Sequence, residues 1–199
     1  MKFQTQHITA KDGNNYCLRQ AEVADAAALL DLLRSTAGQT PFLLREPEEV
    51  TMTVEQEESF IQSRMDAPGD LMLLVESEGK VQGLCSLSSV GPFQRYAHRC
   101  NLSIALRKEV WGIGLGRQMM EILLQAAQEV GYEQAELDVI ADNRRAVALY
   151  ESLGFQQYGT MPRNMKYADG TYADAIWMPI IACEFFAPKF FGVAWIIQG

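Results

Sequence analysis

The sequence LDVIADNRRAVALYESLGF, residues 137–155, combines a short apolar run with a helix that has clear start and stop signals. The run LDVI is typical of a buried strand. Asp142 or Asn143 can cap the helix, because a side-chain oxygen there accepts a hydrogen bond from the first turn. Gly154 can end it, since glycine adopts the left-handed conformation that follows many helices. The segment therefore predicts a strand followed directly by a helix.

Residues 111–120, WGIGLGRQMM, form a glycine run that opens an earlier helix. Glycines let the backbone approach a ligand closely, and the amides and dipole of a helix N-terminus favour an anion. A dinucleotide fingerprint needs glycine where Arg117 stands, and a Walker A loop counted from Gly112 needs Gly-Lys in place of Arg117 and Gln118. Both are excluded, which leaves a pyrophosphate site of another kind. The basic residues near this run are Arg107, Lys108, Arg117, Arg144 and Arg145.

An apolar stripe follows the glycine run along one face of a helix that Gly131 can close. Strands are predicted before this helix, at residues 98–106, and after it, at residues 135–140, and we expect them to be parallel with a right-handed crossover. Residues 71–90 predict two further strands joined by a tight turn, which are antiparallel. The sheet is therefore mixed. The helix stripe consists of Leu115, Met119, Leu123, Ala126 and Val130.

The remaining segments predict two hairpins and two helical regions. Residues 9–21 and 155–180 are typical of β-hairpins. Residues 24–37 predict a helix that ends before Gly38. Residues 46–70 concentrate glutamate, which suits either a solvated helix face or an acidic rim that attracts a cationic substrate.

Composition limits the class of function. A chain of 199 residues suits one domain, which we assign to residues 1–180, and a net charge of −8 argues against a nucleic-acid partner. The cysteines form no CxxC pair and only two histidines are present, so we expect no metal and reduced thiols in a cytoplasmic protein. The N-terminus lacks the apolar core of a signal peptide. The cysteines are Cys17, Cys85, Cys100 and Cys183.

The tail, residues 181–199, is strongly apolar, but Glu184, Pro188 and Lys189 interrupt it. Its last apolar run is too short for a membrane span of about 20 residues. So much exposed Phe, Trp and Ile would form an apolar patch in water. We therefore expect the tail to pack on the domain or on a partner in a homodimer, rather than on a membrane.

Asn143, Ala146 and Tyr150 lie three and four residues apart, so they share one helix face over two turns. This pattern, one strand–helix–strand step after the glycine run, resembles the GNAT superfamily of acetyl-CoA-dependent N-acetyltransferases over about residues 16–180. The glycine run resembles (Arg/Gln)-x-x-Gly-x-(Gly/Ala), with Trp111 at the usual basic position. The second motif, Asn-x-x-Ala-x-x-Leu-Tyr-x-x-x-Gly-Phe, is matched fully. The resemblance implies an α/β, three-layer fold: a mixed, mostly antiparallel sheet with helices on both faces and a V-shaped splay between the two central parallel strands.

The resemblance also implies roles for individual residues. Tyr150 is implied as the general acid that protonates the departing CoA thiolate, and a phenol can donate to a thiolate when it is suitably oriented. The backbone of residues 104–106 is implied to bind the pantetheine arm, the amides of residues 112–117 the pyrophosphate, and Asn143 another part of the cofactor. The implied cofactor-binding residues are Ile104, Ala105, Leu106, Gly112, Ile113, Gly114, Leu115, Gly116, Arg117 and Asn143.

The general base is left open. Many relatives with a similar strand carry Glu where this chain has Asn101, and an amide cannot accept a proton as a base. The candidates are a water held by Asn101 or Ser103, the carboxylate of Glu58, and His98. We expect direct transfer of an acetyl group from acetyl-CoA to a primary amine of a small molecule or peptide. The alternative is a non-catalytic acyl-CoA-binding or regulatory protein with the same cofactor loop.

Overall fold

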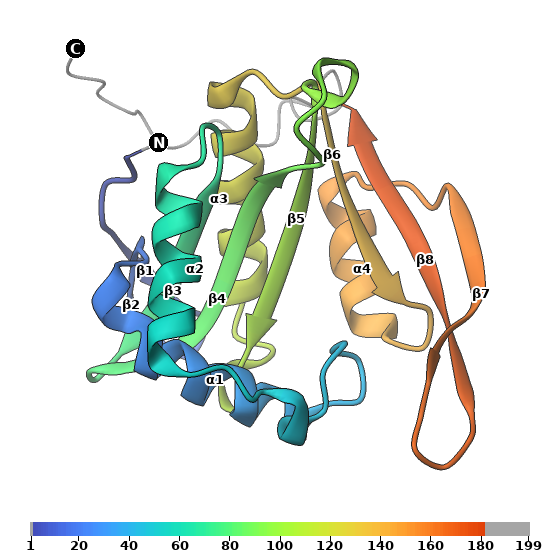
Figure 1. The fold of residues 1–199 in the computed structure, drawn as a ribbon, viewed down its shortest axis with the longest axis horizontal. Helices are drawn as coiled ribbons and strands as arrows, with labels where there is room; N and C mark the ends of the chain where they lie inside the picture. Colours follow the sequence, from blue (N-terminus) through green and yellow to red (C-terminus); the bar gives the residue numbers. More distant parts are fainter. Residues whose placement is uncertain (1, 182–199) are drawn as a thin grey trace.

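A computed structural model describes residues 2–181, which are built around one eight-stranded sheet. The strands lie in the order β1-β2-β3-β4-β5-β6-β8-β7 (Figure 1). All neighbours are antiparallel except β5 and β6, so the expected mixed, mostly antiparallel sheet is confirmed. The strands are β1 (Gln6–Thr9), β2 (Asn15–Gln20), β3 (Leu71–Ser77), β4 (Lys80–Ser89), β5 (Arg99–Leu106), β6 (Gln134–Ile140), β7 (Gly159–Lys166) and β8 (Tyr172–Ile181).

Helices cover both faces of this sheet (Figure 1). The helices α1 (Ala26–Gln39) and α2 (Val54–Asp66) lie on one face, which we call the front face. The helices α3 (Leu115–Val130) and α4 (Arg144–Leu153) lie on the other, the back face. The expected three-layer arrangement is therefore confirmed.

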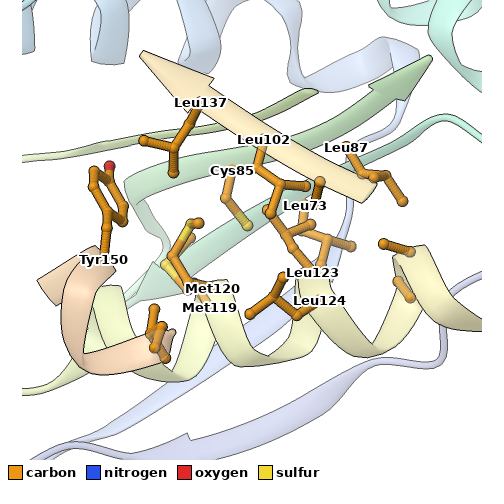
Figure 2. Close-up of a cluster of buried hydrophobic side chains, with 14 of the residues drawn as sticks. Leu73, Cys85, Leu87, Leu102, Met119, Met120, Leu123, Leu124, Leu137 and Tyr150 are labelled. Atoms are coloured by element: carbon orange, nitrogen blue, oxygen red, sulfur yellow. The ribbon is translucent and has the colours of Figure 1, made fainter. Parts of the chain in front are cut away.

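Each face of the sheet has its own apolar core. On the back face, Leu102 and Leu137 of the central strands pack with Met119 and Leu123 of α3 (Figure 2). On the front face a smaller core is formed by Leu29, Leu32, Ile61, Met72 and Leu74. Side chains alternate between faces along a strand, so the neighbours of the back-face leucines point to the front.

The helices α3 and α4 begin and end where local sequence signals place them. Gly131 and Gly154 follow them with φ of 95° and 102°, in the left-handed conformation that glycine adopts without strain. The Asn143 side chain accepts a hydrogen bond from the Ala146 amide at 3.2 Å, so Asn143 is the N-cap of α4. Of the predicted α3 stripe, only Val130 is outside the core, at 37% exposed.

One predicted helix boundary is wrong. The helix α1 continues through Gly38 and ends at Gln39, where we expected it to stop before that glycine. The next residue, Thr40, is extended and precedes Pro41. Proline disfavours helical geometry in the residue before it, so Pro41 explains the actual end.

The expectation that the apolar tail packs on the domain or on a partner concerns residues 182–199, which lie outside the described residues. Within residues 2–181, the structure contains no helix of the length and apolar character that crossing a bilayer requires.

Candidate active site

The two parallel strands β5 and β6 separate after a short paired region. They pair only at Arg99–Gln134, Cys100–Ala135 and Asn101–Glu136, although both strands continue well beyond these rows. Figure 1 shows them diverging toward their carboxyl ends. We call the opening between residues 102–106 and 137–140 the splay. Backbone groups on the facing edges of the splay lack their sheet partner, so they are available to a ligand that enters there.

The glycine loop lies at the carboxyl end of β5 and leads into α3. Gly112 and Gly114 have φ of 84° and 94°, a conformation that other residues rarely adopt, so both glycines are required by the backbone. Gly114 is the N-cap of α3, and the loop is tied to the first hairpin by the Lys11 amide, which donates to the Ile113 carbonyl at 2.8 Å. The first-turn amides of an α-helix have no partner within the helix, and together with the helix dipole they favour an anion at the start of α3.

Two cations flank the glycine loop. A Cβ atom built on Gly114 would lie 3.5 Å from Cε of Lys11, and one built on Gly112 would lie 3.1 Å from Nη2 of Arg145. Arg145 also lies over the Trp111 ring, 5.5 Å from its centroid. Lys11 was not among the residues we considered, because it comes from the distant first hairpin and no local motif includes it.

Two arginines that the sequence placed beside the loop make other contacts. Arg107 is buried, and its Nη2 lies 2.5 Å from Asp31 of α1, so it does not lie open to a ligand. Arg117 bonds to the Ser152 hydroxyl of α4 and lies 3.4 Å from Glu121. The Arg117 amide belongs to the first turn of α3.

The residues implied for the pantetheine arm lie along the splay. Ile104, Ala105 and Leu106 belong to the part of β5 that has no pairing with β6. The Leu106 carbonyl accepts a hydrogen bond from the Trp111 indole at 2.8 Å, which fastens the glycine loop to the end of the strand. Gly116 lies close by, since a Cβ on it would be 3.5 Å from a Leu106 methyl carbon.

Tyr150 approaches the splay from the back face. Figure 2 shows its ring rising from α4 beside Leu137, with the hydroxyl at the end away from the helix. Only 8% of the residue is exposed, and its ring is edge-on to Phe155 with centroids 5.9 Å apart. Burial raises the pKa of Tyr150 to about 12, so the phenol is protonated at neutral pH. No hydrogen bond holds its hydroxyl within residues 2–181, which leaves the proton free for a ligand.

The front face of the splay is polar. Asn101 and Ser103 alternate with buried Cys100 and Leu102, so they point away from the back-face core, and both are exposed. The Ser103 hydroxyl is 2.7 Å from the Ser86 hydroxyl on β4. Neither residue is ionisable in the neutral pH range, so as bases they could act only through a water.

A carboxylate that sequence reasoning missed lies on the β6 lip of the splay. Asp138 alternates with Leu137 and Val139 of the back-face core, so it points to the front face. Asp138 remains accessible, yet its pKa is raised, first by partial burial and second by the charge of Glu136. The available signal is an acidic residue inside an otherwise apolar strand, a pattern that predicts a buried strand but not a site.

The two other candidate bases are not brought to the splay. Glu58 lies on α2, which packs on α1, on the short helix Val23–Asp25 and on β3. The His98 carbonyl accepts hydrogen bonds from the amides of Glu133 and Gln134, which places His98 at the paired end of β5 and β6, opposite the opening. Within the described residues, no group of three or more His, Cys, Asp or Glu side chains could hold a metal ion.

Comparison with known proteins agrees with this geometry. Residues 31–155 match the family model described as Acetyltransferase (GNAT) family. The L-methionine sulfoximine/L-methionine sulfone acetyltransferase of Pseudomonas paraeruginosa is 23% identical over 146 residues, which are 73% of this chain and 83% of that protein.

Solved structures share the fold. An acetyltransferase of the GNAT family from Streptococcus pneumoniae superposes with a TM-score of 0.79 and 28% identity, covering 83% of this chain and 99% of that one. A GNAT superfamily phosphinothricin acetyltransferase from Sinorhizobium meliloti, solved in complex with AcCoA, gives a TM-score of 0.75 and 21% identity, covering 92% and 93%.

Proposed function

The chain belongs to the Acetyltransferase (GNAT) family, and we propose that it transfers the acetyl group of acetyl-CoA directly to a primary amine of a small molecule or peptide. The observation that carries this proposal is the splay, which has a protonated phenol, Tyr150, on its back face and a carboxylate, Asp138, on its front face. A donor and an acceptor can therefore meet from opposite sides of the sheet.

The described residues fit acetyl-CoA. The left-handed glycines and the first-turn amides of α3 suit a pyrophosphate that approaches the backbone closely, and Lys11 and Arg145 add charge beside it. Residues 104–106 offer unpaired strand edge to the amides of a pantetheine arm. When bound, acetyl-CoA supplies an activated acetyl thioester at the splay.

We assign the proton transfers to two side chains. The acceptor reacts as the neutral amine, after its ammonium form has lost one proton to solvent. An Oδ of Asp138 accepts the second proton, which the nitrogen loses as its bond to the acetyl carbon forms, because the nitrogen becomes a stronger acid in that step. The Tyr150 hydroxyl donates its proton to the sulfur as the carbon–sulfur bond breaks. Burial keeps Tyr150 protonated until that moment, and the raised pKa of Asp138 makes it a better base.

For the acceptor we propose a primary amine that enters from the front face. The relative from Pseudomonas is named for a small amino-acid derivative. We also propose a cytoplasmic location, supported by the free thiols of Cys17, Cys85 and Cys100.

Release of free CoA thiol from acetyl-CoA, measured against a panel of amino acids, amines and short peptides, tests this proposal. We expect turnover with at least one amine, together with an N-acetyl product of the expected mass. Tight acetyl-CoA binding without acetylation of any amine would instead support the non-catalytic alternative.

A further inference from the structure

Glu136 is a buried carboxylate in the last paired row of β5 and β6, on the same face of β6 as Asp138. Only 4% of it is exposed, and its two oxygens lie 2.8 Å and 2.7 Å from Nη2 of Arg99. The Trp177 indole donates a hydrogen bond to it at 3.2 Å, and the side-chain Nε2 of Gln134 donates to it at 3.4 Å. A buried carboxylate is costly unless it is paired and hydrogen-bonded, so this one has a full set of partners.

Trp177 connects Glu136 to Asp138. In the pairing of β6 with β8, Trp177 lies directly opposite Asp138, and directly opposed side chains on one face are about 5 Å apart. The indole also packs against Tyr158 in an edge-to-face arrangement, with ring centroids 5.8 Å apart. The ring is therefore fixed by Glu136 and Tyr158 as a wall beside Asp138.

Glu136 also acts on Asp138 as a like charge. The two residues are two positions apart on one strand and point to the same face, which separates their Cα atoms by roughly 6.6 Å. Arg99 partly offsets this charge, but only its Nη2 engages Glu136, and its Nε is buried without a partner among the described residues. The other side chains facing this region from β5, β8 and the loop after α1 are neutral: Asn101, Ser103, Trp177 and Phe42.

This inference rests on the proposed function. We propose that Glu136 is a positioning residue of the acceptor site: its carboxylate fixes the Trp177 indole beside Asp138, and its negative charge tunes Asp138 as the base. Glu136 does not touch the reacting atoms. It acts through Trp177, which shapes the amine site, and through the field that it exerts on Asp138.

The two effects are separable by two substitutions. E136Q keeps an oxygen that can accept from the Trp177 indole but removes the charge. We expect the acid limb of kcat/KM against pH to move lower by about half a pH unit, because a like charge that opposes ionisation of Asp138 is lost. E136D keeps the charge but is one methylene shorter, so we expect an unchanged acid limb and a KM for the amine raised by about fivefold as the indole is released.

The indole N–H resonance of Trp177, identified by its absence in W177F, supplies a readout that does not depend on turnover. We expect it to shift in E136D, and we expect W177F to show the same rise in KM as E136D. Thermal melting of each variant checks that it folds. If E136Q does not fold because Arg99 loses its partner, E136D and W177F still decide the positioning role.

The outcomes distinguish this inference from the proposed function. Suppose that D138N removes the acid limb, that folded E136Q leaves the limb at its original pH, and that E136D leaves KM unchanged. These results would overturn the role of Glu136 and leave the proposed function standing. Absence of turnover in the unmodified protein with every amine would overturn both.

Discussion

Among single residues, the chemistry that we propose at the splay depends on Tyr150 and Asp138, and burial raises the pKa of both. Tyr150 is buried in apolar surroundings, which raise the pKa of its phenol, so it keeps its proton. Asp138 is accessible, and the pKa of its carboxyl is also raised. They come from different faces of the sheet. Neither needs the other in order to adopt its position, because α4 fixes one and β6 the other.

The protonation of Asp138 predicts a pH dependence. The pKa of Asp138 lies above its ordinary value of 3.8, and the base is active when ionised, so kcat/KM should rise as pH increases through the folded pKa. D138N should remove this limb and lower kcat by about 100-fold or more, the usual contribution of a general base. A pH profile of kcat/KM from pH 4 to 9 at saturating acetyl-CoA measures this limb. If D138N keeps the limb of the unmodified protein, another group is the base.

The two cations beside the glycine loop predict a binding effect. K11M and R145M should each weaken acetyl-CoA binding by about three- to tenfold, with a smaller loss at high salt, because exposed charges are screened by ions. Arg95 lies in the short helix before β5, and the glycine loop follows the other end of that strand. R95M, which removes a cation far from the loop, is therefore the matched control. Calorimetric titration measures the affinity for acetyl-CoA, and an equal loss of affinity in all three variants would argue against specific contacts.

At the scale of elements, the ends of α3 and α4 follow from local sequence. Gly131, Asn143 and Gly154 act within one turn of their own positions, so a capping rule suffices to place them. The splay and Asp138 could not be placed in this way. The row at which β5 and β6 part depends on how two distant segments pack, and the accessibility of Asp138 depends on that parting.

Local sequence patterns also cannot predict the long-range contacts of the cations. Arg107 follows β5 directly and was expected beside the glycine loop, but it reaches α1 and pairs with Asp31. Lys11 is brought to the loop by the first hairpin, whose backbone bonds to Ile113. Both outcomes are set by tertiary packing, which a single segment of sequence does not contain.

Alanine substitutions at two glycines of the loop should have opposite effects on the free energy of unfolding. G114A puts a side chain at φ of 94° and should lower the free energy of unfolding by about 1–2 kcal/mol, the cost of a left-handed residue. G116A lies inside α3, where its Cβ would meet only ordinary contacts from 3.5 Å, so stability should stay equal or rise by up to about 1 kcal/mol. Urea unfolding compares them, and equal destabilisation would contradict a specific need for glycine at position 114.

At the scale of the whole molecule, the sheet is one continuous structure that opens only at its centre. One back-face core spans both sides of the splay, and α3 and α4 cover the back face beneath it. A ligand that bridges β5, the glycine loop and α4 would add contacts across an opening where β5 and β6 share only three paired rows.

Acetyl-CoA should accordingly stabilise the folded chain. At a concentration 100 times its Kd, a ligand that binds only the folded state adds about 2.7 kcal/mol to the free energy of unfolding. We expect a clear rise in Tm with acetyl-CoA and CoA, and none with NAD or ATP, whose sequence motifs are absent. An equal rise with ATP would indicate a general phosphate site.

The role of Tyr150 is measured by comparing Y150F with the unmodified protein, with kcat and the Kd for acetyl-CoA determined in parallel. The substitution removes one hydroxyl from a ring whose packing against Phe155 it preserves. If Tyr150 protonates the leaving sulfur, kcat should fall by about 100-fold or more while Kd changes by less than about twofold. Equal losses in kcat and in binding would show that Tyr150 only packs, and would contradict acid catalysis at the splay.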